Sequence, residues 1–371
     1  MVKWIGPASA FALVALLTAD ARTSLCEDPP TSPLSLITLS ATVKDEKCHI
    51  HGSQHPEDMD NPGAVKTFSL YDTDDEGGVI DRMAEVRGGR DLHVVHDRLM
   101  RHVEALPVDY CKLTDEHVDA LGYLMGQYQK YRDDLLRLRA DAKRFRVGLM
   151  EQVADTGLLP DGFADLEAEI TYMRIRELRP EKVMELSPNC GWSTHYLLSA
   201  LRDNGAGELH SYDLVDCSLK VLNAVSPDLV EGRWYFHQGD AFQSHLTKDT
   251  ADSFDYFFID SEHTFEFATR IIDTLFRTRR RDLPLRGGVH DSYNNNDKPS
   301  SEFQAFLEFF AGQSGERRMF TASPYKSMPF YATIMRIREE LGVSSGGAED
   351  NVAPCKWTVY ANGMVFFDLY R

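Results

Sequence analysis

Short apolar runs alternate with amphipathic stretches over the second half of the chain, from about residue 162 onward. The apolar runs are predicted to be strands, at 183–186, 209–214, 234–237, 254–259 and up to 290. The stretches between and after them have apolar residues at helical spacing and are predicted to be helices, at 166–178, 192–202, 219–225, 265–276 and 303–310. Strands that alternate with helices form a doubly wound parallel sheet. The sequence therefore predicts an α/β fold.

A further apolar stretch, 359–367, contains the dipeptide Asn362-Gly363, which is the commonest two-residue turn of a β-hairpin. We expect an antiparallel strand pair here, closing one edge of the sheet. With this pair the sheet has seven strands, most of them parallel, and a Rossmann-like architecture.

The pattern is different before residue 161. Lys3, an apolar run at 8–17 and the small residues Ala19-Asp20-Ala21 predict a signal peptide or other targeting segment over 1–21. Residues 22–66 are rich in Pro, Ser, Thr, Asp and His and predict a tail without regular structure. Thr114 is a candidate N-cap for a long helix. We therefore expect a mainly helical N-terminal extension over 67–160, either a packed layer or a lid, and the α/β domain over 161–371.

The N-terminal segment predicts entry into the secretory pathway or export from the cell, with cleavage leaving no stable membrane span. Organellar import and uncleaved membrane anchoring are the alternatives. The six cysteines are an even set, as suits an oxidising compartment, but the sequence does not specify which of them pair.

The net charge of −18 makes nucleic acid a poor partner, because such a surface repels phosphate backbones. Self-association into a homo-oligomer stays open.

Polar residues stand where the predicted strands end. Ligands of open parallel sheets bind beyond these ends, and a helix N-terminus after a small-residue turn can seat a polar or anionic group. The turn here is Ser187-Pro188-Asn189-Cys190-Gly191. The next four strand ends carry Asp213, Gly239-Asp240-Ala241, Asp260-Ser261-Glu262-His263 and His290-Asp291.

These strand ends resemble those of the class I S-adenosylmethionine-dependent methyltransferases, and within them the branch of macrocin-type small-molecule O-methyltransferases. The segments that carry the resemblance are 185–194, 211–213, 238–241, 254–263 and 287–291. One position departs from the family: Ser187 stands where the family usually has glycine.

The resemblance implies methyl transfer from S-adenosylmethionine to a hydroxyl of a small-molecule acceptor, of sugar or phenolic type. It implies that Glu185, Ser187 and Gly191 shape the pocket for the methionine part and that Ser193 hydrogen-bonds its carboxylate. Asp213 would accept hydrogen bonds from the ribose hydroxyls and Asp240 one from the adenine amino group. Ala241 and Asp260 complete the expected cofactor-binding set.

Transfer to a hydroxyl needs a group that removes its proton. His263 is the leading candidate base, because a near-neutral imidazole suits this task, and His290 and Asp291 are its competitors. Asp260 and Asp291 are also candidate ligands of Mg²⁺, which prefers oxygen donors. The alternative for Asp260 is that it caps the following helix.

Two other functions stay open. A nicotinamide-dependent oxidoreductase would have a Gly-x-Gly-x-x-Gly turn, and the turn at 187–191 lacks two of those glycines. A non-catalytic binding or interaction protein could keep the same fold, since fold alone does not prove activity.

Overall fold

The computed structural model describes residues 37–42, 65–70, 113–154, 163–244, 246–247, 250–293, 298–323, 326–344, 352–353 and 363–370. The chain divides into two units, Met1–Arg132 with Ser327–Asp350, and Asp133–Lys326 with residues 351–371. The predicted targeting segment lies outside the described residues. Among those that are described, no helix is both long and apolar enough to cross a membrane.

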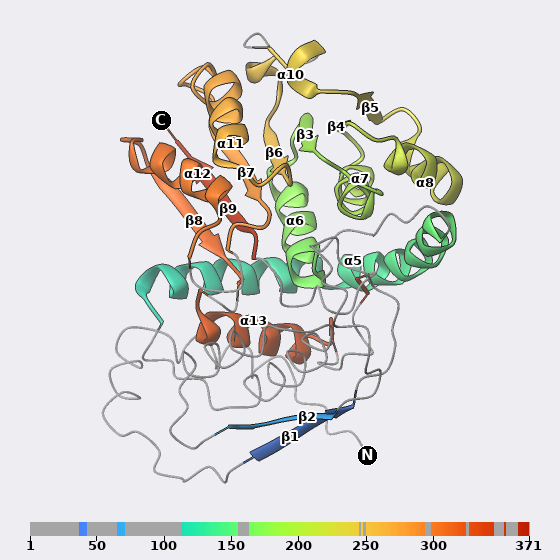
Figure 1. Ribbon diagram of the computed structural model, residues 1–371, viewed down its shortest axis with the longest axis vertical. Helices are drawn as coiled ribbons and strands as arrows, with labels where there is room; N and C mark the ends of the chain where they lie inside the picture. The colour runs from blue at the N-terminus through green and yellow to red at the C-terminus, as the bar shows by residue number, and fades with distance from the viewer. Residues whose placement is uncertain are drawn as a thin grey trace. The chain divides into compact units, whose positions relative to one another are not determined.

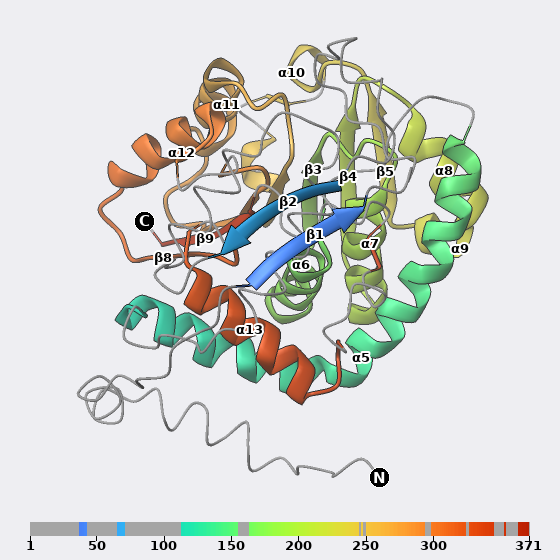
Figure 2. The same cartoon turned by 60° about the horizontal axis from the view of Figure 1, so that its bottom comes forward.

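The first unit contains a two-stranded antiparallel sheet. β1 (Ile37–Thr42) pairs with β2 (Val65–Leu70), and Figure 2 shows the two arrows running in opposite directions. The sequence predicted a tail without regular structure over 22–66, where β1 lies, and a mainly helical extension from residue 67, where most of β2 lies. Ile37, Leu39 and Ala41 alternate with hydroxyl side chains, which is a strand pattern. The structure therefore places strands at two ranges that overall composition did not indicate.

Helix α5 (Asp115–Val153) begins in the first unit and continues into the second. Thr114 caps it as predicted, because the backbone N–H of His117 donates to its Oγ1 at 3.3 Å. α13 (Met328–Glu340) also belongs to the first unit, where the Nε of Arg132 donates to the carbonyl of Leu341 at 2.6 Å. The division thus falls inside α5, and the first unit includes a helix from the region expected to be wholly α/β.

The second unit is built on a seven-stranded sheet in the order β5-β4-β3-β6-β7-β9-β8 (Figure 1). Its five parallel strands are β3 (Lys182–Leu186), β4 (Glu208–Asp213), β5 (Trp234–Gln238), β6 (Tyr256–Ile259) and β7 (Leu285–Val289). The helices are α6 (Asp165–Leu178), α7 (Trp192–Asn204), α8 (Cys217–Val225), α9 (Pro227–Val230), α10 (Ala241–Ser244), the 3₁₀ turn η3 (Ala251–Ser253), α11 (Phe265–Ile271) with its π-helical continuation η4 (Ile272–Phe276), and α12 (Ser301–Ala311). The predicted seven-stranded, mostly parallel Rossmann-like sheet is confirmed.

β3, β6 and β7 are buried along almost their whole length, and their successive side chains point to opposite faces of the sheet. Met184 and Leu186 of β3 belong to an apolar core with the aromatic side chains of η4 and α12. Glu185, between them, faces α7, whose Ser193 and Thr194 donate to it. α11 accordingly packs beside α12 on one face, and α6 beside α7 on the other (Figure 1).

The antiparallel pair at the sheet edge exists, but its predicted turn was wrong. β9 (Val365–Leu369) lies between β7 and β8 (Arg317–Thr321) and pairs antiparallel with both. Both edges of β9 are thus occupied, which leaves no place for a hairpin partner joined to it through Asn362-Gly363. Gly363 instead passes close to another segment, since a Cβ there would lie 2.2 Å from the Cβ of Ser323. Residues 359–362 themselves lie outside the described part.

Candidate functional site

The register of the parallel strands places the predicted residues in one row. Leu186 is paired with Tyr212 and with Ile259, and Ile259 is paired with Val289. The next residues along, Ser187, Asp213, Asp260 and His290, therefore stand together at the carboxyl edge of the sheet. This is the edge at which open parallel sheets bind their ligands.

Asp260, His263 and Asp291 form the centre of this edge. Their potential ligand atoms all lie within 4.8 Å of one another. The Nε2 of His263 is 3.4 Å from Oδ2 of Asp291 and 3.8 Å from Oδ1 of Asp260. The structure thus brings together the candidate base and both candidate metal ligands.

The backbone and the charge of His263 are both unusual. His263 and Asp291 have φ values of 58° and 50°, in the left-handed region that non-glycine residues seldom adopt. Such conformations persist where the surrounding structure fixes them, often at functional sites. Burial acts to lower the pKa of His263, but the hydrogen bond that its ring donates to Glu302 and the charges of Asp291 and Asp260 raise the pKa to about 9. The imidazole is therefore protonated at neutral pH in the free chain, which does not suit the proton-accepting role expected of it.

His290 is enclosed by carboxylates. Only 2% of its side chain is exposed, and its Nδ1 lies 3.2 Å from both Asp260 and Asp291. Its Nε2 lies 3.3 Å from Oε2 of Glu167 on α6. Burial opposes the charged form, yet these three carboxylates hold the pKa of His290 well above its usual value. The structure therefore places His290 behind the two aspartates as a buried cation, rather than at an open position where it could meet an acceptor.

The same environment sets the charges of the two aspartates. Burial acts to raise the pKa of Asp260, but the adjacent His290 and His263 hold it below its usual value. For Asp291 burial prevails, and its pKa is raised. Asp260 therefore carries the firmer negative charge, and Asp291 is the stronger proton acceptor of the two.

Glu302 is a member of this cluster that the sequence analysis missed. Its side chain is fully buried at the start of α12, where Oε2 lies 2.9 Å from Nδ1 of His263 and Oε1 accepts from the hydroxyl of Ser261 at 2.5 Å. The sequence held one signal: Glu302 shares a helix face with Phe306 and Phe309, at spacings of four and seven residues. A glutamate is almost never fully buried on an apolar helix face unless a partner pairs with it.

The turn after β3 is tied to the end of β4. The backbone N–H of Asn189 donates to Oδ2 of Asp213 at 2.9 Å, and that of Val215 donates to Oδ1 at 3.1 Å. Burial, the largest influence, raises the pKa of Asp213. Asp213 thus stabilises the turn, and each of its oxygens keeps further lone-pair capacity for a ligand.

Glu185 and Ser193 lie beneath the turn rather than in it. Glu185 is fully buried and accepts from the hydroxyls of Ser193 at 2.8 Å, Thr194 at 2.9 Å and Ser211 at 2.5 Å. Burial raises the pKa of Glu185 to about 7, against these hydrogen bonds. Ser193 was expected to bind the methionine carboxylate, but the structure directs its hydroxyl to Glu185 and leaves 1% of the residue exposed. The pair fixes the first turn of α7 against β3.

Asp240 and Ala241 follow β5 at the same edge. Oδ1 of Asp240 accepts from the backbone N–H of Phe242 at 2.9 Å, and Oδ2 lies 3.5 Å from Arg270. Ala241 is buried as the first residue of α10. Asp240 therefore stabilises its own turn through one oxygen, and its other oxygen is directed at an arginine.

Two of the six cysteines form a disulfide at this edge. Cys190, in the turn after β3, is bonded to Cys217, the first residue of α8, with the two Cα atoms 4.7 Å apart. The other four cysteines, and Asn294 to Asn296 after Asp291, lie outside the described residues.

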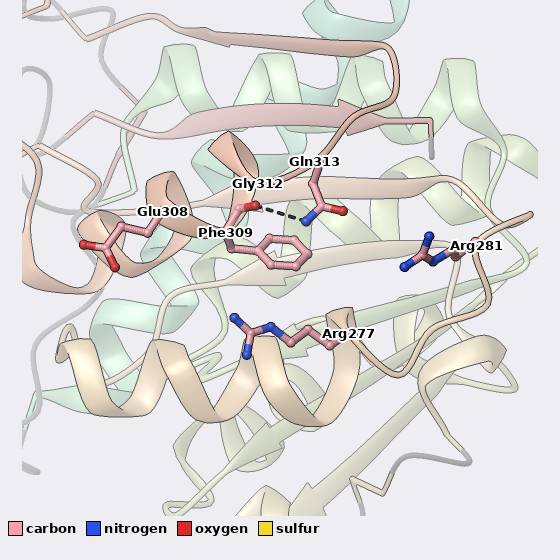
Figure 3. A pocket seen from close by; sticks show the side chains of 6 residues that line it. All are labelled: Arg277, Arg281, Glu308, Phe309, Gly312 and Gln313. Atoms are coloured by element: carbon pink, nitrogen blue, oxygen red, sulfur yellow. Dashed lines mark hydrogen bonds between the residues drawn. The ribbon is translucent and has the colours of Figure 1, made fainter.

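A cavity of about 410 Å³ lies elsewhere (Figure 3). Arg277 and Arg281 lie on one side of it, and Glu308, Phe309, Gly312 and Gln313 line the other. Arg277 and Arg281 precede β7, at the edge where the parallel strands begin. The cavity is therefore distinct from the cluster of Asp260, His263 and Asp291, which lies beyond the strand ends.

The comparisons with known proteins bear on this geometry. Residues 185–282 match a family model described as a methyltransferase domain. No curated protein matches the chain. Among solved structures, an O-methyltransferase from Bacillus cereus in complex with SAH is similar, with 11% identity over 61% of this chain and 90% of that one and a TM-score of 0.41. The O-methyltransferase TomG from Streptomyces achromogenes, in complex with SAM, has 14% identity over 61% and 89% and a TM-score of 0.39. The family match, over residues 185–282, agrees with the resemblance to methyltransferases that the strand ends indicate.

Proposed function

We propose that the chain transfers a methyl group from S-adenosylmethionine to a hydroxyl of a small molecule, of sugar or phenolic type. The observation that carries the proposal is the cluster of Asp260, His263 and Asp291 at the same sheet edge as the turn at 187–191. The turn, Asp260 and His263 lie in the segment that matches a methyltransferase domain. Methyl transfer forms a bond from the acceptor oxygen to carbon, breaks the sulfonium carbon–sulfur bond and releases the hydroxyl proton. A cofactor seat and a set of charged groups at one sheet edge suit this reaction.

Asp213 and the turn are the proposed cofactor seat. Asp213 is already held by the Asn189 and Val215 N–H groups, so it is fixed before a ribose arrives. Preorganised acceptors of this kind bind without reordering. Exposed apolar side chains flank the edge, with Leu214 70% exposed after Asp213 and Phe265 37% exposed after His263. Phe265 could contact the ring of a phenolic acceptor.

Asp260, Asp291 and His263 would hold a divalent cation. Four carboxylates converge here, including Glu167 and Glu302, against two histidines, so the cluster has an excess of negative charge. Carboxylate oxygens suit Mg²⁺ and Mn²⁺, whereas an imidazole nitrogen favours a first-row transition metal. The donor set therefore fits Mn²⁺ at least as well as the Mg²⁺ expected from sequence. When bound, such a cation would lower the pKa of the acceptor hydroxyl.

Three side chains of the cluster, His263, Asp291 and His290, have different roles in binding protons. His263, with a pKa raised to about 9 by Glu302 and the aspartates against the effect of burial, keeps its proton at neutral pH unless a cation displaces it. While His263 is protonated, Asp291 is the better proton acceptor of the two aspartates, because burial raises the pKa of Asp291. His290 holds both aspartates through its Nδ1 and stays out of contact with the acceptor.

The location of the reaction is part of the proposal. We infer that the chain passes through an oxidising compartment, as its N-terminal sequence predicts. The Cys190–Cys217 disulfide supports this inference, because disulfides persist chiefly in such compartments.

The test is calorimetric titration of the purified chain with S-adenosylmethionine, alongside Asp213→Ala and a control, Asp273→Ala. Asp273 is also a carboxylate, but its side chain is 53% exposed in η4 and pairs with Arg277. We expect binding that is lost in Asp213→Ala and kept in the control. A panel of acceptors with Mg²⁺, Mn²⁺ or a chelator would then measure methyl transfer. If the folded wild-type chain does not bind, the enzyme proposal fails and the non-catalytic alternative replaces it.

A further inference from the structure

The turn after β3 combines an unfavourable backbone with a covalent restraint. Ser187 has φ 61° and Asn189 has φ 46°, and Gly191, at φ 90°, is the only one of the three that adopts such values without steric conflict. Asparagine tolerates this region better than serine does. Ser187 is therefore the position at which the turn is hardest to keep in this shape, and it stands where the resembling family has glycine.

Three contacts hold the turn at Asn189 and Cys190. The N–H of Asn189 donates to Asp213, and its carbonyl accepts from the N–H of Ser218 at 3.0 Å. The third contact is the Cys190–Cys217 bond, which joins the turn to the first residue of α8. All three connect the turn to the end of β4 or to the segment that follows it, and the disulfide is the covalent contact among them.

We propose that the Cys190–Cys217 disulfide holds the cofactor turn in its binding shape and offsets the serine at position 187. This inference rests on the proposed function. The cysteines act as positioning residues: Cys190 is fully buried and Cys217 is 7% exposed, so neither presents an open sulfur to a ligand. Without the bond, the chain around Ser187 would relax toward ordinary φ values, and the turn would no longer be held in one shape for a ligand.

The bond also makes cofactor affinity dependent on redox state. A dithiol such as dithiothreitol would reduce it by thiol–disulfide exchange when local opening exposes a sulfur: the Cys190–Cys217 S–S bond breaks, each sulfur gains a hydrogen, and the dithiol becomes a disulfide. Two electrons and two protons pass from the dithiol to the chain. Oxidised chain would therefore bind the cofactor more tightly than reduced chain.

The experiment is a cycle of four proteins titrated with S-adenosylhomocysteine by calorimetry. They are the oxidised wild type, C190S/C217S, Ser187→Gly, and the triple variant that combines them. We expect C190S/C217S to bind roughly tenfold more weakly, which corresponds to about 1.4 kcal/mol. Ser187→Gly should restore most of that loss in the cysteine-free chain, and its gain in affinity there should exceed any change that it makes in the oxidised chain.

A matched control separates this mechanism from general loosening. Ser226, at the end of α8, has φ −141°, so Ser226→Gly relieves no left-handed conformation. Added to C190S/C217S, it should restore nothing. Amide hydrogen exchange of residues 187–191 gives a second readout, faster without the bond and slowed again by Ser187→Gly. If C190S/C217S does not fold, wild type treated with dithiothreitol takes its place, with circular dichroism confirming that it stays folded.

The outcomes are distinct. If the oxidised wild type binds and the cysteine-free or reduced chain binds equally well, the disulfide inference is overturned and the proposed function stands. If affinity falls but Ser187→Gly and Ser226→Gly restore it equally or not at all, the bond does not act through position 187. If the oxidised wild type does not bind, the proposed function fails and this inference fails with it.

Discussion

Glu302 sets the charge of His263, and replacing it with glutamine isolates that effect. Glutamine keeps the size of the side chain and an oxygen that can accept from Nδ1 of His263, but it removes the negative charge. Because Glu302 is fully buried, its charge acts on His263 with little screening. We therefore expect the pKa of His263 to fall in Glu302→Gln.

The size of the fall follows from the geometry. The pKa of His263 is about 9 against an ordinary value of 6.5, although burial alone would lower it. The hydrogen bond from Nδ1 of His263 to Glu302, at 2.9 Å, is the strongest of the influences that raise this pKa, ahead of the charges of Asp291 and Asp260. An opposite charge this close shifts a pKa by about 1 to 3 pH units, and water at the 40% exposed ring places this case in the lower part of that range. We expect Glu302→Gln to lower the pKa by about 1 to 2 pH units.

The same variant also tests how the protonation of His263 changes the free energy of unfolding with pH. A histidine whose pKa is raised on folding stabilises the fold below its unfolded value of 6.5. That contribution is lost as pH rises from 6.5 through about 9. The difference in unfolding free energy between wild type and Glu302→Gln should therefore be largest below pH 6.5.

The assay is an NMR titration of chain labelled with ¹³C at histidine Cε1, in the presence of a chelator, with His263→Ala used to assign the signal. Glu308→Gln is the control, because Glu308 is also on α12 but bonds to Gln304 at 3.1 Å. An unchanged His263 pKa in Glu302→Gln, or an equal fall in Glu308→Gln, would refute the reasoning.

Two further predictions concern buried groups beneath and beside the turn. Burial raises the pKa of Glu185 to about 7. The wild-type chain should therefore lose on the order of 3 kcal/mol of stability as the pH rises from 4.5 to about 7. Glu185→Gln should not show this loss when urea unfolding is measured across the same pH range. An equal loss in both proteins would contradict the assignment. Burial, with Arg202 and Arg144, lowers the pKa of His195 to about 3, and its ring stacks on Phe145 with centroids 4.4 Å apart. The free energy of unfolding of the wild type should therefore fall by about 2 kcal/mol as the pH drops from 6.5 to 5. His195→Phe should show no such fall in thermal melts. If both proteins show the same fall, protons reach the ring of His195 in the folded chain.

Much of the α/β domain could be predicted from sequence because its signals are local. Each parallel strand is a short apolar run next to an amphipathic helix, and the carboxyl ends of such strands meet at one edge. Asp260, His263 and Asp291 were therefore expected near one another before any coordinates. The position of β9 could not be inferred in this way, since its pairing with β7 and β8 depends on segments more than forty residues earlier.

The supporting residues of the site were harder to predict than its centre. Glu302 reaches His263 from a helix 39 residues later, and no strand end marks it. The disulfide joins two turns that follow adjacent strands, and sequence spacing alone does not select Cys217 as the partner of Cys190. Ser193 fits the family motif, but its hydroxyl is taken by Glu185, a contact set by side-chain rotamers rather than by pattern.

The insertion of β9 between β7 and β8 governs the order in which the sheet can be assembled on a ribosome. β8 is synthesised before β9, and its sheet partner among the described strands is β9. β7 likewise waits for β9 on its outer side, while its inner side can pair with β6 at once. The nascent chain can therefore form β3 to β7 early, but β8 stays without its neighbour until residue 369 has emerged. A messenger truncated shortly before β9 would leave the outer edge of β7 and both edges of β8 unpaired. Unpaired edges of this kind make aborted chains prone to aggregate and recognisable to chaperones.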